Sequence, residues 1–366
     1  MDWNFFHELL SIDSTSGKER KVAEWLAERL PGMFPPSNPP VLRVDEVGDG
    51  TLNLLLTWGT PRIVFCTHLD TVPPYIEPSF TEVVIKGRGS CDAKGQVFAM
   101  VTACQKLAKQ GNTNFGLLLL AGEETGSWGA KAFAKTDFRA EYLVVGEPTD
   151  NCMVSASKGT KSFDLKFTGE AFHSGYPQYG VSAVDLFVEF VNALKAKDFG
   201  MDHVLGETTW NIGLVHSDNP QNILSPELTC RLYFRTTFVS DEAVTAWMEA
   251  QGQPEEDTVS RAFTRTGSRS DAEETVSSSG RITVTPRGGD TPARYWTVEG
   301  LPAKSVAFGS DAPHLIKFQH KAICGPGSIT VAHRDDEQVR VADLATAVEQ
   351  YLKLYDAVTG TAEETK

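Results

Sequence analysis

Five side chains that could bind a metal ion or move a proton each follow a short apolar stretch of the chain: His68, Asp70, Glu123, Glu124 and Glu147. The apolar stretches are residues 63–67, 115–121 and 142–145. If these stretches are neighbouring parallel strands, their carboxyl ends meet at one edge of a sheet, where sites in open α/β folds form. One imidazole among several carboxylates suits a divalent ion such as zinc, manganese or cobalt.

A sixth candidate, Asp92, lies in the segment 87–95, directly before a stretch with the pattern of a long helix. Two metal ions about 3.5–4 Å apart need a carboxylate that can bridge them. His68 and Asp70 are two residues apart, so in an extended backbone they share a face, and Asp70 could orient the imidazole. The residue types alone do not decide which of Glu123 and Glu124 binds metal and which moves a proton.

Each motif has a simpler interpretation when it is taken alone. A His-x-Asp sequence, a Glu-Glu pair and the turn at 146–149 are all common in surface loops. Their shared position after successive apolar stretches favours a common site. Other catalytic motifs are absent from the sequence: the Gly87–Gly89 pair has Asp92 in place of a third glycine, and there is no P-loop, G-x-S-x-G elbow or H-E-x-x-H.

The elements that would position these residues indicate an α/β fold. Short buried strands alternating with helical patterns predict a mostly parallel sheet. From residue 159 the pattern changes to strand, helix, two strands, helix and strand, which is typical of an α+β ferredoxin-like unit. We therefore expect a discontinuous catalytic domain, 1–158 and 289–366, with an insertion at 159–288. Residues 252–280 are polar, and we expect them to be loosely packed.

Composition excludes several classes of function. There are 34 basic and 48 acidic residues, so the net charge is −14 and no basic surface for nucleic acid or an anionic membrane is expected. The six cysteines form no C-x-x-C pair, and we expect them to be reduced. The longest apolar run, 117–121, is far shorter than a membrane span, and the first residues do not resemble a signal peptide. These features predict a cytoplasmic protein.

The motifs taken together resemble the M20 family of co-catalytic metallohydrolases. This family includes acetylornithine deacetylase, succinyl-diaminopimelate desuccinylase, aminoacylase-1 and glutamate carboxypeptidase. The matching stretches occur in the family's order across nearly the whole chain: 67–73, 87–95, 122–126, 146–149 and 332–337. The resemblance implies that the insertion acts as a lid and dimerisation domain.

The resemblance also implies a set of metal ligands. Asp92 would bridge two divalent ions, most simply zinc, with cobalt or manganese as alternatives. His68 and Glu147 would complete one metal site, and Glu124 and His333 the other.

The remaining roles are likewise implied by the resemblance. Glu123 would be the general base, and Asp70 would orient His68. His173, in the insertion, would reach the active site of a partner subunit and stabilise the oxyanion, which implies a homodimer. The residues expected to contact the substrate are Asn222, Arg235, Ser310, Gly325 and Gly327.

These expectations describe a two-metal hydrolase that cleaves the amide bond of a small N-acyl amino acid, as acetylornithine deacetylase does. An alternative is a carboxypeptidase or dipeptidase of the same family, which would use the same metal chemistry. A more remote alternative is a binding protein that has kept the fold without catalysis. That alternative predicts the loss of a ligand or of the base, whereas all the expected positions are filled.

Overall fold

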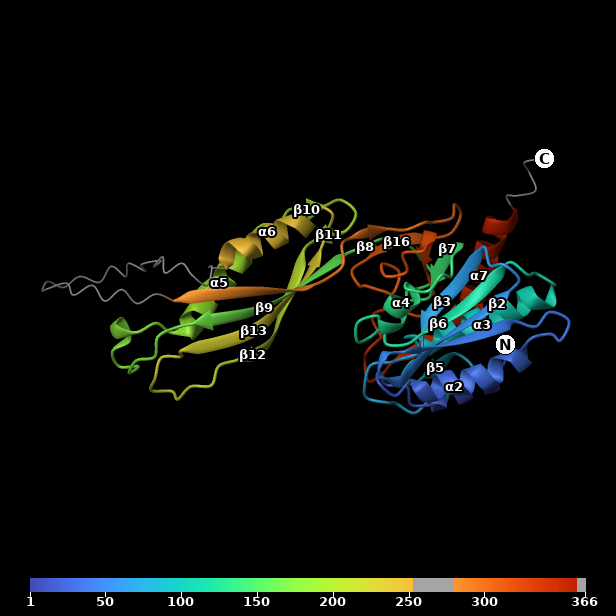
Figure 1. The fold of residues 1–366 in the computed structure, drawn as a ribbon, viewed down its shortest axis with the longest axis horizontal. Helices are drawn as coiled ribbons and strands as arrows, with labels where there is room; N and C mark the ends of the chain where they lie inside the picture. Colours follow the sequence, from blue (N-terminus) through green and yellow to red (C-terminus); the bar gives the residue numbers. More distant parts are fainter. Residues whose placement is uncertain (253–279, 361–366) are drawn as a thin grey trace, which may run out of the picture. The chain divides into compact units, whose positions relative to one another are not determined.

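The computed structural model describes residues 1–252 and 280–360, and the chain divides into two units. Unit 1 contains residues 1–155, 294–305 and those from 310 onward, and unit 2 contains residues 156–293 and 306–309. Figure 1 labels the elements of both units. The segment 252–280, expected to be loosely packed, lies almost wholly outside the described residues.

The core of unit 1 is a six-stranded sheet with the order β1-β2-β6-β3-β7-β17. Strands β6, β3, β7 and β17 are parallel to one another, while β2 pairs antiparallel with β6 and β1 antiparallel with β2. The prediction of a mostly parallel sheet in an α/β fold is therefore confirmed. The bounds of the strands are β1 Val41–Val47, β2 Thr51–Trp58, β3 Ile63–His68, β6 Phe115–Leu120, β7 Ala140–Val145 and β17 Phe318–Ile323.

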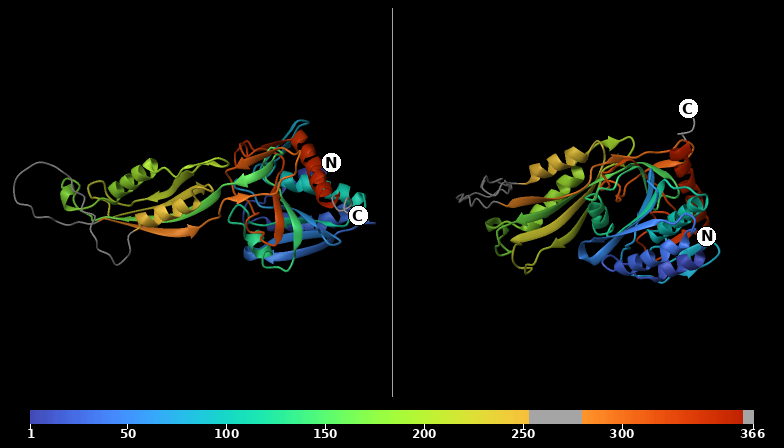
Figure 2. Two further views of the ribbon diagram at one scale, coloured as in Figure 1. Left: turned by 90° about the horizontal axis from the view of Figure 1, so that it is seen from above. Right: turned by 45° about the vertical axis from the view of Figure 1, so that its right-hand side comes forward.

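Alternate residues of these strands point to opposite faces of the sheet, as strand geometry requires. On one face Leu54, Leu56 and Phe65 join a large apolar core with helices α1, α2, α3 and α7. On the other face Asn53 meets α4, donating from Nδ2 to Gly129 O at 2.9 Å. Figure 2 shows the helices of unit 1 around its sheet. Their bounds are α1 Trp3–Ser11, α2 Arg20–Arg29, α3 Lys94–Lys109, α4 Trp128–Phe133 and α7 Val341–Thr359.

Two three-stranded sheets and three short 3-10 helices also occur in the described residues. One three-stranded sheet has the order β18-β5-β4, and another has the order β15-β8-β16. The bounds of these strands are β4 Ser79–Phe80, β5 Val84–Lys86, β8 Met153–Ser157, β15 Ala293–Arg294, β16 Ala303–Val306 and β18 Gln338–Arg340. The short 3-10 helices are η1 Leu30–Met33, η2 Gly48–Gly50 and η3 Pro177–Tyr179.

Unit 2 follows the predicted order of strand, helix, two strands, helix and strand. Its antiparallel sheet has the order β12-β13-β9-β14, which is the ferredoxin-like arrangement. Alternate residues of β9, among them Phe163, Leu165 and Phe167, pack against α5 and α6 on one face. The bounds are β9 Gly159–Thr168, α5 Ala183–Ala196, β10 Met201–Asp202, β11 Gly206–Glu207, β12 Thr209–His216, β13 Glu227–Thr236, α6 Asp241–Gln251 and β14 Arg281–Gly288. The role of unit 2 as a lid and dimerisation domain stays a prediction.

Among the described residues, none of the helices combines the length and the apolar character that crossing a bilayer would need.

Asn53 offers a test of how the sheet is joined to the loop after β6. Its Nδ2 donates to Gly129 O, and its Oδ1 accepts from Ala121 N at 3.1 Å, both in buried surroundings. Asn53→Ala leaves both backbone groups without a partner, so we expect the free energy of unfolding to fall by about 2–4 kcal/mol. Urea unfolding followed by circular dichroism measures this. The control is Thr57→Ala at a half-buried position of the same strand, expected to cost less than about 1 kcal/mol. Equal losses of unfolding free energy in the two variants would contradict the role assigned to the hydrogen bonds of Asn53.

Candidate active site

The carboxyl ends of β3, β6 and β7 bring the candidate residues to one edge of the sheet. His68 is the last residue of β3, Glu123 and Glu124 follow β6, and Glu147 follows β7. Backbone hydrogen bonds continue past the strand ends, from Leu69 N to Leu120 O at 2.8 Å and from Gly146 N to Cys66 O at 2.7 Å. The edge predicted from the sequence is therefore present in the structure.

Asp92 lies at the centre of this edge and faces two imidazoles. Its Oδ1 is 3.0 Å from His68 Nε2, and its Oδ2 is 3.3 Å from His333 Nε2. His333 Nε2 is also 3.0 Å from Glu124 Oε1. His68, Asp92 and Glu124 each offer a ligand atom, all within 4.8 Å of one another. One carboxylate with an oxygen toward each of two histidines is the arrangement that a bridging ligand requires.

Glu147 brings a further carboxylate that lacks a protein partner. The residue is 4% exposed, and its Oε1 is a buried atom without a hydrogen bond. Burial raises the pKa of Glu147 well above its usual value, and the carboxylates of Glu123 and Asp92 raise it further. An unpartnered buried oxygen beside other carboxylates is costly unless a cation is bound. The donor set therefore fits divalent metal ions.

Asp70 organises the edge through its contacts with the main chain. Its Oδ1 accepts from Glu123 N at 3.0 Å and its Oδ2 from Glu124 N at 3.1 Å, while Oδ1 is 3.4 Å from His68 Nδ1. The same imidazole nitrogen is 2.9 Å from Asp70 O. The structure thus places Asp70 between the histidine that it was predicted to orient and the two glutamates.

Glu123 and Glu124 differ in their surroundings, although the sequence alone could not separate them. The Glu124 carboxylate lies in the cluster with His68 and Asp92, whereas Glu123 is not part of that group. Burial raises the pKa of Glu123 well above its usual value, and the carboxylates of Asp311, Glu124 and Asp92 act in the same direction. A carboxyl group with a raised pKa is better suited to accept a proton near neutral pH.

The two imidazoles respond to the surrounding negative charge. Burial alone would lower the pKa of His68, but the carboxylates of Asp70 and Asp92 outweigh it and raise the pKa well above the usual value. The carboxylates of Asp92 and Glu124 raise the pKa of His333 to about 10. His333 has a φ of 63°, a left-handed conformation that is uncommon for residues other than glycine.

Four residues that our sequence interpretation did not assign also belong to this edge. Ser16 Oγ donates to Asp70 Oδ2 at 3.0 Å. Arg88 and Glu337 form a buried ion pair of 2.6 Å. Asp311 is 1% exposed, its Oδ1 has no hydrogen bond, and burial raises its pKa to about 6. Arg88 and Glu337 stand in stretches that carry the family resemblance, and Asp311 directly follows the predicted Ser310, but only tertiary packing shows their contacts.

Three predicted residues lie in unit 2. His173 forms an isolated antiparallel bridge with Ile223, and Ser174 N donates to Asn222 O at 2.9 Å, so His173 and Asn222 lie on adjacent segments. Both residues are exposed, and His173 Nδ1 accepts from Gly175 N at 3.0 Å. Arg235 is half-buried on β13, with its guanidinium 5.0 Å from the ring centre of Tyr233.

Predicted substrate contacts in unit 1 lie in two loops. Ser310 is buried, and its Oγ accepts from Ala312 N at 3.3 Å. The N–H of Gly325 donates to Thr149 Oγ1 at 3.0 Å, so this amide is already engaged within the protein. Gly327 has a φ of +79°, and a Cβ there would lie 2.5 Å from Cys91 Sγ, which explains the need for glycine.

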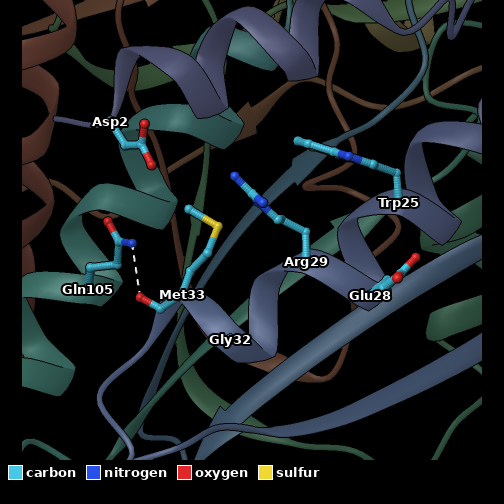
Figure 3. Close-up of a pocket in the computed structure, with 7 residues that line it drawn as sticks. All are labelled: Asp2, Trp25, Glu28, Arg29, Gly32, Met33 and Gln105. Atoms are coloured by element: carbon cyan, nitrogen blue, oxygen red, sulfur yellow. Dashed lines mark hydrogen bonds between the residues drawn. The ribbon is translucent and has the colours of Figure 1, made fainter.

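A hollow elsewhere in unit 1 lacks comparable chemistry. It lies beside α2, η1 and α3 and is lined by residues that include Trp25, Arg29, Met33 and Gln105 (Figure 3). Gln105 Nε2 donates to Met33 O at 3.1 Å. The residues that line it include no histidine or cysteine, so the sheet edge is the stronger candidate site.

Comparisons with known proteins support the interpretation of this edge. The sequence profile of peptidase family M20/M25/M40 matches residues 64–357. A probable carboxypeptidase of Aspergillus terreus is 33% identical over 97% of this chain and 86% of its own length. A probable carboxypeptidase of Emericella nidulans is 32% identical over 96% of this chain and 88% of its own length.

Solved structures with the same fold are more distant in sequence. A tripeptidase from Staphylococcus aureus has a TM-score of 0.75 at 19% identity, covering 97% of each chain. An M20 family metallo-carboxypeptidase from Sulfolobus solfataricus has a TM-score of 0.67 at 16% identity, covering 97% of this chain and 99% of its own. The resemblance inferred from the motifs is thus confirmed: the chain belongs to peptidase family M20/M25/M40, whose members hydrolyse amide and peptide bonds.

Proposed function

We propose that this protein is a two-metal carboxypeptidase that releases a residue with a free α-carboxylate from a small peptide. The observation that carries the two-metal centre is Asp92, whose two oxygens face His68 and His333 separately. The relatives named probable carboxypeptidase support the peptidase alternative. None of the relatives described above is named as an acetylornithine deacetylase, so deacylation of N-acyl amino acids becomes the second candidate.

The proposed ligands follow from the arrangement of donors. Asp92 would bridge the two ions, His68 and Glu147 would bind one, and Glu124 and His333 would bind the other. Zinc is the simplest choice for imidazole and carboxylate ligands, and cobalt or manganese would also suit them. When bound, such ions polarise the scissile carbonyl and lower the pKa of a water molecule held between them.

Glu123 would act as the general base in this proposal. Its carboxylate is not part of the group formed by His68, Asp92 and Glu124, and burial together with nearby carboxylates raises its pKa. It would accept the proton of the attacking water and pass it to the departing amine. Asp70 would fix the tautomer and orientation of His68 while its two oxygens hold the backbone of Glu123 and Glu124.

Residues of unit 2 would recognise the substrate. Arg235 would bind the α-carboxylate, and Asn222 would contribute a hydrogen bond, as would Ser310 of unit 1. His173 would stabilise the oxyanion in the active site of a second subunit, so that the working enzyme is a homodimer. The exposure of His173 and its position beside Asn222 support a contact with substrate.

The first experiment separates the two candidate reactions. N-acetyl dipeptides, the same peptides with a C-terminal amide, and N-acetylornithine are incubated with enzyme loaded with zinc, cobalt or manganese. A carboxypeptidase releases the C-terminal amino acid, and amidation should slow it at least about 10²-fold because the arginine loses its partner. A chelator should abolish turnover, and added metal should restore it. Release of acetate without cleavage of the peptide bond would overturn the carboxypeptidase proposal and favour the deacylase.

A further prediction concerns the general base, Glu123. Glu123→Gln keeps the size of the side chain but removes the base, so kcat should fall by about 10²-fold or more while two metal ions remain bound. Steady-state kinetics and elemental analysis of the purified protein measure the two quantities. Glu82→Gln, at an exposed glutamate of unit 1, is the matched control and should have normal kinetics. Near-normal turnover of Glu123→Gln would show that another group moves the proton.

Subunit exchange tests whether His173 acts in the active site of the partner subunit. His173→Ala and Glu123→Gln should each be nearly inactive as separate proteins. After subunit exchange at equal amounts, half of the dimers are mixed and each of these has one intact site, so about one quarter of wild-type activity should return. Mass spectrometry of isotopically labelled subunits verifies exchange. Verified exchange with no recovery would exclude the role in trans.

A further inference from the structure

Glu337 is a buried carboxylate that the proposed mechanism does not use. It is 1% exposed, and it stands directly before β18, four residues after His333. Strand β18 pairs antiparallel with β5, with Gln338 opposite Lys86. This register brings Glu337 beside the segment that follows β5, which leads to Asp92.

One oxygen of Glu337 gathers the backbone of that segment. Oε1 accepts hydrogen bonds from the N–H groups of Gly89, Cys91 and Asp92, each at 3.0 Å. Neighbouring N–H groups turned toward one anion form an anion-binding concavity, which is filled here by a side chain of the same protein. The backbone nitrogen of the proposed bridging ligand is therefore fixed by Glu337.

The other oxygen of Glu337 is held by Arg88, which is also 1% exposed. Arg88 Nη1 donates to Glu337 Oε2 at 2.6 Å and to Arg334 O at 3.1 Å, and Nε donates to Pro74 O at 3.1 Å. The guanidinium thus contacts the segment next to His333 and the loop after Asp70. Loss of either partner would leave a buried charge without compensation.

We infer that the Arg88–Glu337 ion pair positions Asp92 and His333 for binding of the two metal ions. Asp92 is fixed through its N–H, and His333 through the carbonyl of the next residue, so one buried pair sets the spacing of ligands from distant parts of the chain. Neither residue touches the ligand atoms themselves; both act through the backbone. This inference rests on the proposed two-metal site.

The experiment measures metal binding directly. Apoprotein of the wild type and of Glu337→Gln is titrated with Co²⁺, followed by visible absorption and by calorimetry. Glu337→Gln keeps one oxygen for the three N–H groups but sets an amide against Arg88. At least one Co²⁺ dissociation constant should rise by about 10–100-fold, as is usual when a group behind a metal ligand is changed. The kcat of Glu337→Gln, relative to that of the wild type, should be higher at saturating Co²⁺ than at limiting Co²⁺.

Two controls separate positioning from a general loss of stability. Asp336→Asn removes the exposed carboxylate next to Glu337, paired with Arg334 at 2.8 Å, and should leave Co²⁺ binding unchanged. Tyr355→Phe removes a hydrogen bond to Asn114, next to the amino end of β6 and so at the opposite edge of the sheet. It should lower the free energy of unfolding by about 1 kcal/mol without changing the Co²⁺ constants.

Arg88→Lys keeps the positive charge but loses the planar guanidinium that contacts three partners. This variant is the second test of the inference if Glu337→Gln does not fold. Its Co²⁺ affinity should also fall. Folded Glu337→Gln or Arg88→Lys protein with wild-type Co²⁺ constants would overturn the inference. Wild-type protein that binds no Co²⁺ would instead overturn the proposed two-metal site, so the two failures are distinguishable.

Discussion

Negative charge concentrated at one buried edge of a sheet is the constraint on which the rest of unit 1 depends. Carboxylates cannot be taken out of water without hydrogen-bond donors or cations beside them. Asp70 and Glu337 receive backbone N–H groups, and Asp92 and Glu124 face imidazoles, whereas Glu147 Oε1 has no partner. The carboxylates that accept hydrogen bonds from backbone N–H groups therefore hold the backbone in place. The other carboxylates are those whose negative charge bound cations would neutralise.

The donors that satisfy these carboxylates come from distant parts of the chain. Glu337 is 245 residues from Asp92, and Asp70 is 53 residues from Glu123. Such contacts form only when the sheet, α3 and the segment before α7 have come together. Metal affinity and the folding of unit 1 are consequently linked, because the unfolded chain has no preformed site. The site is a property of the assembled unit and not of any one loop.

The sequence predicted best those parts whose residues are buried on both sides. Strands β3 and β6 are continuous apolar runs, fully buried, so they and the polar residues after them could be found directly. Strands β1 and β2 were not predicted. Strand β1 lies at the edge of the sheet, mixes exposed and half-buried residues and shows no clear period. Strand β2 is almost wholly buried, but Thr51, Asn53 and Thr57 interrupt its apolar residues. Asp92 and His333 could be paired only through the family resemblance. The contacts of Glu337 could not be predicted, because they depend on the register of two short strands far apart in the chain.

The division of residues between the units has a consequence for substrate choice. All proposed metal ligands and the proposed base belong to unit 1, where a changed residue would leave buried charge unbalanced. His173 and Asn222 belong to unit 2 and are exposed, where substitutions usually alter stability by less than about 0.5 kcal/mol. In the proposed mechanism, substitutions at Asn222 would therefore change contacts with the substrate while the metal ligands and the base of unit 1 stay in place.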